Sequence, residues 1–330
     1  MQLPSAKLGK DGPLLPRIGL GLAALGRPGY INLGHGKDFA EGYVIEAMER
    51  RTHRMLDAAY AGGIRYFDVA RSYGRGEAFL KSWLDQHQPE DVFVGSKWGY
   101  TYTADWRVEA EQHEVKEHSV HKLAEQWSLS KALLPYLKLY QVHSATLDTG
   151  VLDNKEVLSY LAGLKDSGIR IGLSLTGTEQ AQTLERAMHT RVDGVYLFDV
   201  VQVTFNVLEQ SLTDHLSNVQ ESGLGIVVKE ALANGRLTPR NQDPAFAKTK
   251  DALDLLARKY GVGMDAVALA FVLAQPWAHL VLSGAATETH LQSNLEAARV
   301  ALSEDDLAHL RYFAQAKEAY WHQRSRLPWN

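Results

Sequence analysis

Three stretches of the sequence decide the fold: residues 64–70 (IRYFDVA), 92–99 (VFVGSKWG) and 137–144 (LKLYQVHS). Each is a mostly apolar run that carries an ionisable side chain at or near its downstream end. Apolar runs without strict alternation are typical of parallel strands that helices cover on both faces. The downstream ends of such strands share one rim in an α/β barrel, where catalytic side chains gather. We therefore expect a single site that contains Asp68, Tyr73, Lys97 and His143.

The rest of the chain repeats the alternation of strand and helix. Further strand candidates cover residues 17–21, 169–175, 198–205, 224–231 and 279–285, which makes eight in all. Helix candidates occupy residues 44–62, 76–86, 120–134, 155–166, 178–188, 209–222, 251–260, 264–274 and 287–300. This pattern predicts a (β/α)8 TIM barrel in one domain, residues 1–330.

Three segments lie outside the regular barrel pattern. The Asp11–Gly12 dipeptide favours a tight turn, so the N-terminal residues are expected to form a β-hairpin that closes one barrel end. Residues 100–118 are expected to form a long loop over the active-site rim, with a solvated helix as the alternative. Residues 303–320 predict one additional C-terminal helix with Ser303 as its N-cap.

Composition excludes several classes of function. The 330 residues include 35 Lys and Arg against 39 Asp and Glu, with no basic cluster, so nucleic acid is not an expected partner. The absence of cysteine excludes disulfides and thiolate chemistry. No stretch is apolar for the length of a membrane span and no signal peptide is visible, so no membrane partner and a cytoplasmic location are expected. Nothing in the sequence specifies an oligomeric state.

The four reactive side chains suit proton transfer to a carbonyl oxygen. A tyrosine with an ordinary pKa of about 10 is a weak acid at neutral pH, but a nearby ammonium favours its ionised form. Lys97 is the candidate ammonium, Asp68 its carboxylate partner, Tyr73 the acid and His143 the group that orients the substrate oxygen. Amino acids provide no hydride, so reduction of a carbonyl also requires a cofactor.

The same residues resemble motifs of the aldo-keto reductase superfamily, in order, from residue 17 to residue 294. DVARSYG resembles the family's Asp-x-Ala-x-x-Tyr-Gly segment, SKWG its Thr-Lys-x-Gly, and LYQVHS its strand that ends in histidine. The resemblance implies a nicotinamide cofactor, NADP(H) or NAD(H), and a small-molecule carbonyl or alcohol substrate. It also implies the catalytic roles already given for Asp68, Tyr73, Lys97 and His143.

The resemblance assigns a cofactor site along the chain. It places Ser174, Gln202 and Asn206 at the nicotinamide carboxamide, and the backbone of Gly21, Leu22 and Ala23 near the same ring. The segment SGAATETHLQSN resembles the family's binding site for the adenosine phosphate, which implies contacts from Ser283, Gly284, Ala285, Thr287, His290 and Asn294. A helix N-terminus there suits an anion.

The sequence departs from the family at five positions in three segments. Leu175 stands where asparagine is usual, which removes one carboxamide contact. Lys229 stands where a ring commonly stacks on the nicotinamide, and it is expected to meet a cofactor phosphate, the substrate or Glu230. Ala285, Ala286 and His290 replace basic residues that many relatives use for the 2′-phosphate, so the expected preference for NADPH over NADH is weakened.

Other candidates have structural alternatives. Tyr30 and Trp98, together with His143, are expected to line the substrate pocket, although aromatic residues also pack cores. His113, His118 and His121 lie close in sequence without a convincing carboxylate pattern, so they are interpreted as surface histidines and no metal site is expected. Two other functions compete with the oxidoreductase hypothesis. One is a Schiff-base lyase or aldolase that uses Lys97 or Lys229, and the other is a cofactor-binding regulatory subunit with negligible turnover.

Overall fold

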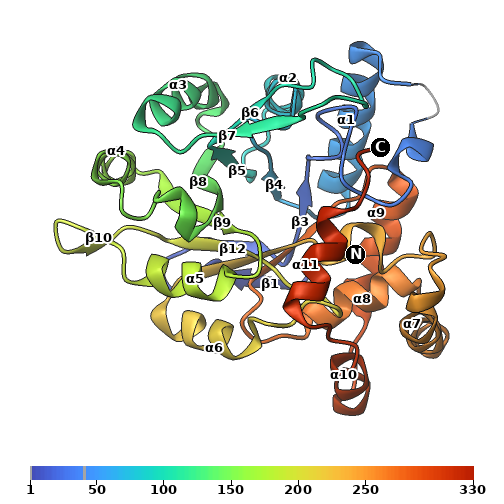
Figure 1. The fold of residues 1–330 in the computed structure, drawn as a ribbon. Helices are drawn as coiled ribbons and strands as arrows, with labels where there is room; N and C mark the ends of the chain where they lie inside the picture. The colour runs from blue at the N-terminus through green and yellow to red at the C-terminus, as the bar shows by residue number, and fades with distance from the viewer. Residues whose placement is uncertain (1, 40–41) are drawn as a thin grey trace.

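The computed structural model describes residues 2–39 and 42–330, and its central feature is a closed barrel of eight parallel strands (Figure 1). The strand order around the barrel is β12-β13-β14-β3-β4-β5-β8-β9. The barrel strands are β3 (Ile18–Gly21), β4 (Tyr66–Asp68), β5 (Phe93–Trp98), β8 (Leu137–Ala145), β9 (Arg170–Leu175), β12 (Val200–Thr204), β13 (Gly225–Lys229) and β14 (Leu280–Ser283). The predicted fold class and all eight predicted strands are confirmed.

Helices surround this barrel (Figure 1) and shield the outer faces of the strands. They are α1 (Ile45–Ala61), α2 (Gly76–His87), α3 (Val120–Ser130), α4 (Lys155–Asp166), α5 (Gln180–Met188), α6 (Thr213–Ser222), α7 (Ala247–Tyr260), α8 (Met264–Leu273) and α9 (Glu288–Leu295). Most are amphipathic, but every residue of α8 except Asp265 is buried. None of the helices in the described ranges has the length and apolar content needed to cross a lipid bilayer.

The N-terminal hairpin closes the end of the barrel at which the strands begin, as predicted. Strand β1 (Ser5–Lys7) pairs antiparallel with β2 (Leu14–Pro16). Leu8 and Leu15 are buried in a cluster with apolar side chains from the starts of the barrel strands, among them Tyr66 and Leu280. Because this end is filled by apolar packing, the opposite, carboxyl end is the one available for chemistry.

The barrel interior is tightly packed just above this cluster. A Cβ atom on Gly95 would lie 2.3 Å from the Tyr66 hydroxyl, so only glycine leaves room for that ring. The Tyr66 hydroxyl in turn donates to the Asp68 carboxylate over 3.3 Å. Packing inside the barrel therefore fixes the floor on which the reactive residues lie.

The segment after β5 forms a loop over the rim, and the alternative of a solvated helix is wrong. Its ends pair as an antiparallel ribbon of β6 (Tyr100–Tyr102) and β7 (Glu114–Lys116). Another ribbon, β10 (Arg191–Val192) with β11 (Val195–Tyr196), follows α5 at the edge of the molecule (Figure 1). Short 3-10 turns cover His35–Asp38, Lys131–Leu133, Leu147–Thr149, Ala233–Gly235, Pro244–Phe246 and Glu296–Arg299.

The C-terminal region forms two helices where the sequence predicts one. Ser303 caps α10 (Glu304–Arg311) through a capping box with Asp306, as the sequence indicates. The helix then stops, and the backbone N–H of Gln315 donates to the carbonyl of Leu208 rather than to its own helix. The chain resumes as α11 (Lys317–Ser325), which lies across the mouth side of the barrel (Figure 1). The break allows Arg324 of α11 to line the central cavity.

Candidate active site

The reactive centre is built on three neighbouring barrel strands, β4, β5 and β8. The Lys97 ammonium donates to the Asp68 carboxylate, lies 3.4 Å from the Tyr73 hydroxyl, and is completely buried. It also donates to the carbonyl of Val69 over 3.1 Å. The structure therefore brings Asp68, Lys97 and Tyr73 into one hydrogen-bonded group, as the strand ends predict.

Strand β12 also holds the Asp68 carboxylate in place, through Gln202. Its Oδ2 atom accepts from the Gln202 side-chain amide over 2.9 Å, while Oδ1 receives the Lys97 ammonium. Both oxygens of this buried carboxylate are thus hydrogen-bonded, which is what a buried charge requires. The resemblance assigns Gln202 to the nicotinamide carboxamide; its amide nitrogen bonds the Asp68 carboxylate, and the residue also lines the central cavity.

His143 faces Tyr73 from the end of β8. The two rings lie 5.6 Å apart in an edge-to-face arrangement, and the ring of Tyr100 lies 5.0 Å from that of His143. Burial, followed by the charge of Lys97, lowers the pKa of His143 well below its ordinary value of 6.5. The imidazole is therefore neutral at physiological pH and can donate one hydrogen bond to a substrate oxygen.

The protonation of Tyr73 differs from the expectation that Lys97 lowers its pKa. Burial, followed by the Asp68 carboxylate, raises the pKa of Tyr73 well above 10, against an opposing contribution from Arg27. The Lys97 charge does not prevail because Lys97 is ion-paired with Asp68, whose carboxylate offsets its field at the phenol. Tyr73 is consequently a protonated phenol at neutral pH.

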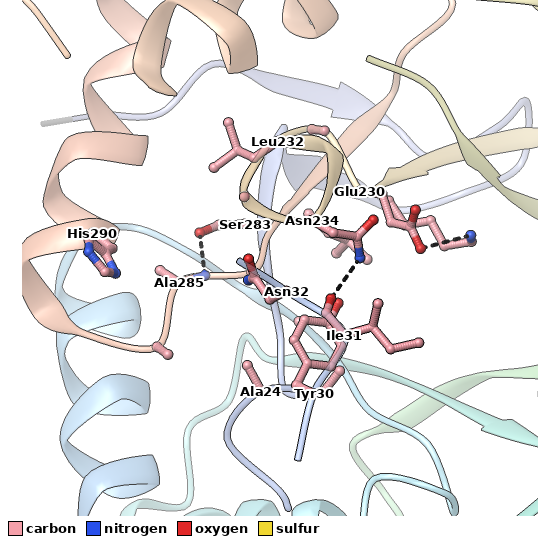
Figure 2. A pocket seen from close by; sticks show the side chains of 18 of the residues that line it. Ala24, Tyr30, Ile31, Asn32, Glu230, Leu232, Asn234, Ser283, Ala285 and His290 are labelled. Carbon is pink, nitrogen blue, oxygen red and sulfur yellow. Dashed lines mark hydrogen bonds and ion pairs between the residues drawn. The ribbon is translucent and has the colours of Figure 1, made fainter. Parts of the chain in front are cut away.

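A cavity of about 580 Å³ extends from this centre across the barrel mouth. Asp68, Tyr73 and His143 line one end, and His290, Ser293 and Asn294 of α9 line the other. Between them lie the ends of β3, β13 and β14 with the loops that follow (Figure 2). One continuous space therefore connects the proton-transfer group with a helix N-terminus, and it has room for an extended ligand.

The far end of the cavity is organised by the segment that follows β14. Thr287 caps α9 by accepting from the backbone N–H of His290 over 3.2 Å. The Ser283 hydroxyl and the Asn294 amide are hydrogen-bonded at 2.8 Å, and Ser283 also accepts from the backbone N–H of Ala285. Gly284 has no heavy atom within 4 Å of the Cβ position that it lacks, so a ligand can approach the backbone there.

Most of the predicted cofactor residues line the cavity, namely Gly21, Ala23, Gln202, Lys229, Ser283, Gly284, Ala285, His290 and Asn294. Leu22 and Ser174 are fully buried behind its wall, and Ser174 accepts from the backbone N–H of Ser144 over 2.8 Å. Thr287 acts as the helix cap without lining the cavity. Asn206 is also removed from the wall, because its amide bonds Glu230, Tyr320 and the backbone of residues 208 and 209.

Among the predicted substrate residues, Tyr30 and His143 line the cavity, and Tyr30 is drawn at its edge in Figure 2. The prediction for Trp98 is wrong. Lys97 points into the barrel, so the next residue of the strand points outward. Trp98 is fully buried and packs edge-to-face against His118.

The interpretation of three surface histidines is correct only for His121, which is exposed. His118 is buried, bonds the carbonyl of His143 over 3.0 Å, and has its pKa lowered by burial to about 4. The ring of His113 stacks on Trp329 at a centroid distance of 4.0 Å. Within the described residues, no group of three His, Asp or Glu side chains forms a possible metal site.

Sequence patterns do not indicate the ion pairs that line the cavity. Arg27 pairs with Glu114 at 2.8 Å, and Arg324 pairs with Glu230 at 2.6 Å. Arg240 pairs with Asp38, and its guanidinium lies 3.4 Å from Nε2 of His290. The partners in these pairs are separated by 87, 94 and 202 residues, so no sequence spacing indicates them.

Comparisons with known proteins agree with this geometry. The sequence profile described as "Aldo/keto reductase family" matches residues 17–314. The chain is 25% identical to "Aldo-keto reductase str7" of Strobilurus tenacellus, over 99% of this chain and 96% of that protein. It is 28% identical to "Protein tas" of Escherichia coli, over 79% of this chain and 88% of that protein.

A solved structure of the holo form of an aldo-keto reductase from Bacillus halodurans has the same fold. Its TM-score is 0.73 at 19% identity, with 96% of this chain and 97% of that chain covered. With a closed eight-stranded barrel, a strand-borne reactive centre and a family profile over most of its length, the chain belongs to the aldo/keto reductase family.

Proposed function

We propose that the protein is a nicotinamide-dependent oxidoreductase that interconverts carbonyl compounds and alcohols. The observation that carries the proposal is the buried contact of Lys97 with both Asp68 and Tyr73, at the end of a cavity large enough for an extended cofactor. The nicotinamide supplies the hydride, which no side chain can provide.

In this proposal Tyr73 transfers the proton. During reduction the Tyr73 hydroxyl donates its proton to the carbonyl oxygen, and the Lys97 ammonium at 3.4 Å stabilises the resulting phenolate. His143, neutral because of its burial, donates a hydrogen bond that orients the same oxygen. Asp68 keeps Lys97 charged and positioned, so it acts without touching the substrate.

The residues present fit a nicotinamide dinucleotide. Gly21 and Ala23 would face the ring from β3, and the open backbone at Gly284 and the N-terminus of α9 would hold the adenosine phosphate. Leu22, Ser174 and Thr287 would support these contacts from behind the cavity wall. Either NADP(H) or NAD(H) is consistent with this arrangement, because Arg240 provides a cation beside His290 but is already paired with Asp38.

The substrate end of the cavity favours a polar carbonyl compound. Tyr30, Tyr100 and Ser144 line this end together with the charged pairs of Arg27 with Glu114 and Arg324 with Glu230. Hydroxyl groups of a hydroxylated aldehyde, ketone or sugar could bond these side chains. A relative of this chain carries the name "Norsolorinic acid reductase" in Aspergillus flavus, at 25% identity over 84% of this chain, and this name states a reduction.

The test measures nicotinamide oxidation at 340 nm with a panel of aldehydes, ketones and sugars, for the native protein and for Tyr73→Phe. The native protein should turn over at least one class of carbonyl, and the variant should lose roughly 100- to 10,000-fold in rate. Equal turnover by both proteins would reject Tyr73 as the acid.

The Schiff-base alternative now depends on Lys229 alone. Lys97 is fully buried and engaged by Asp68, whereas Lys229 lines the cavity and burial lowers its pKa to about 8. A lysine with such a pKa is a possible nucleophile. Borohydride trapping of a substrate adduct on Lys229, without a nicotinamide requirement, would favour a lyase. Tight cofactor binding without turnover of any carbonyl would favour a regulatory subunit.

A further inference from the structure

Lys229 places a positively charged side chain on the cavity wall without a close carboxylate. It ends β13, directly beside Thr204 of β12 in the parallel register, and its ammonium donates to the Thr204 hydroxyl over 2.6 Å. The nearest carboxylate oxygen, Oε1 of Glu230, lies 3.9 Å away. The Lys229 side chain is 17% exposed, so bulk water screens its charge only in part.

Around the cavity mouth, the positive charge of Lys229 is in excess over the carboxylates that could pair with it. Among the described residues that line this end of the cavity, Asp68 is engaged by Lys97 and Glu114 by Arg27. Glu230 already receives the Arg324 guanidinium at 2.6 Å, so one carboxylate serves two cations. The group formed by Lys229, Glu230 and Arg324 therefore carries a net charge of about +1 when Lys229 is protonated.

The proposed function places a redox-active ring close to this charge. Hydride transfer requires the donor carbon within about 3–3.5 Å of the carbonyl carbon, whose oxygen must reach Tyr73. The rest of the cofactor must follow the cavity to α9, and that path crosses the ends of β13 and β14, which pair side by side. Lys229 stands at the end of β13 on this path.

We propose that Lys229 discriminates between the two oxidation states of the cofactor by weakening binding of the oxidised form. The oxidised nicotinamide ring carries a positive charge and the reduced ring does not, so a fixed ammonium opposes only the oxidised state. This inference rests on the proposed function. It implies that the bound equilibrium is shifted toward reduced cofactor and carbonyl, which favours alcohol oxidation. In that direction the Tyr73 phenol first releases its proton to water, hydride then leaves the alcohol carbon for the ring, and the hydroxyl proton passes to the Tyr73 phenolate, which lies beside the Lys97 ammonium.

The charge on Lys229 responds to pH within an accessible range. Burial lowers the pKa of Lys229 to about 8, while Glu230 opposes this shift. The other charged or titratable groups that act on it come from the elements packed around it, namely Arg324 of α11, Lys97 of β5, Asp68 of β4 and His143 of β8. Discrimination should therefore be present below pH 8 and fade above it.

The experiment measures dissociation constants of oxidised and reduced cofactor by protein fluorescence, in parallel for four proteins. These are the native chain, Lys229→Met, Lys229→Arg and the matched control Lys138→Met, which removes an exposed lysine at the other end of the barrel. In Lys229→Met the ratio of the oxidised to the reduced dissociation constant should fall at least tenfold, because the oxidised form binds more tightly. Lys229→Arg and Lys138→Met should keep the native ratio.

A pH series on the native protein tests the same claim without any substitution. Between pH 7 and pH 9.5, the ratio of the oxidised to the reduced dissociation constant should fall in the native protein toward the value of Lys229→Met. The ratio measured for Lys229→Met should not change with pH. Equal weakening of both forms in Lys229→Met would overturn the inference and assign Lys229 to a cofactor phosphate. Unchanged dissociation constants for both forms would also overturn it and would leave Lys229 facing the substrate. If the native protein binds neither form, the proposed function fails together with the inference.

Discussion

The reactive centre and the loop-built wall of the cavity are stabilised in different ways. The centre consists of Asp68 on β4, Lys97 on the adjacent strand β5, and Tyr73 in the turn that follows β4. The side chain of Lys97 is fully buried. The wall is closed by pairs such as Asp38 with Arg240, which come from distant loops and in which the arginine remains 32% exposed. In the proposed function, the rigid barrel sheet would position the reactive side chains, whereas loops that can vary would carry the side chains that select the ligand.

The largest expected effect comes from breaking the buried pair of the centre. Lys97→Met leaves the Asp68 carboxylate buried without its cation, which should cost about 3–5 kcal/mol of unfolding free energy and abolish most turnover. Arg324→Met breaks the pair with Glu230, where the arginine is 24% exposed, and should cost less. Denaturant unfolding of both variants measures the difference. A larger loss for Arg324→Met would contradict the distinction between centre and wall.

A smaller effect should appear when pH is lowered, because His143 beside the centre and His118 behind it are buried in the neutral form. The pKa of His118 is about 4 and that of His143 is well below 6.5, so the unfolded chain binds more protons than the native state below pH 6.5. The contribution of these histidines to stability should therefore be constant above pH 7, and stability should fall by up to about 1.4 kcal/mol per pH unit for each histidine as pH decreases below 6.5. Unfolding curves from pH 7.5 to pH 5 measure this slope.

His118→Gln provides the control for the pH effect. This variant removes one of the two titrations, so its stability should depend less on pH than that of the native chain. An equal dependence in both proteins would show that His118 is not responsible.

The smallest effect is expected when the pair of Asp38 with Arg240 is broken. Arg240→Gln removes the contact with Asp38, which joins the loop before α1 to the loop after β13. A pair of this kind, whose arginine is 32% exposed, contributes about 0.2–1 kcal/mol, so cofactor binding should weaken by at most about fivefold. NADPH and NADH should be affected equally, because the Arg240 donors already engage Asp38 and the Gly34 carbonyl. Loss confined to NADPH would instead identify Arg240 as a contact of the 2′-phosphate.

The sequence was most informative where a regular element determines the position of a side chain. The eight strands were recognisable from apolar runs, and Asp68, Lys97 and His143 could be assigned to one rim because parallel strands share their ends. The capping residue Ser303 is identified for the same reason, since a cap acts within a few residues.

Prediction failed where tertiary contacts decide the outcome. Trp98 follows Lys97, and only the pleat of β5 determines that it faces away from the cavity. The pKa of Tyr73 depends on burial and on Asp68, neither of which the sequence quantifies. Ion pairs between distant loops, and the break before α11 that places Arg324 in the cavity, depend on how separate segments pack.

The central claim is that Tyr73 delivers the proton while a bound nicotinamide delivers the hydride. The most direct measurement is the single-turnover rate of reduced-cofactor oxidation by a saturating carbonyl substrate, with cofactor fully bound, in native protein, Tyr73→Phe and Tyr30→Phe. The account predicts a loss of at least about 100-fold for Tyr73→Phe, with unchanged cofactor affinity. It predicts a loss of less than about tenfold for Tyr30→Phe, because Tyr30 lines the cavity without being the proposed acid. A Tyr73→Phe rate within about threefold of the native rate would contradict the account.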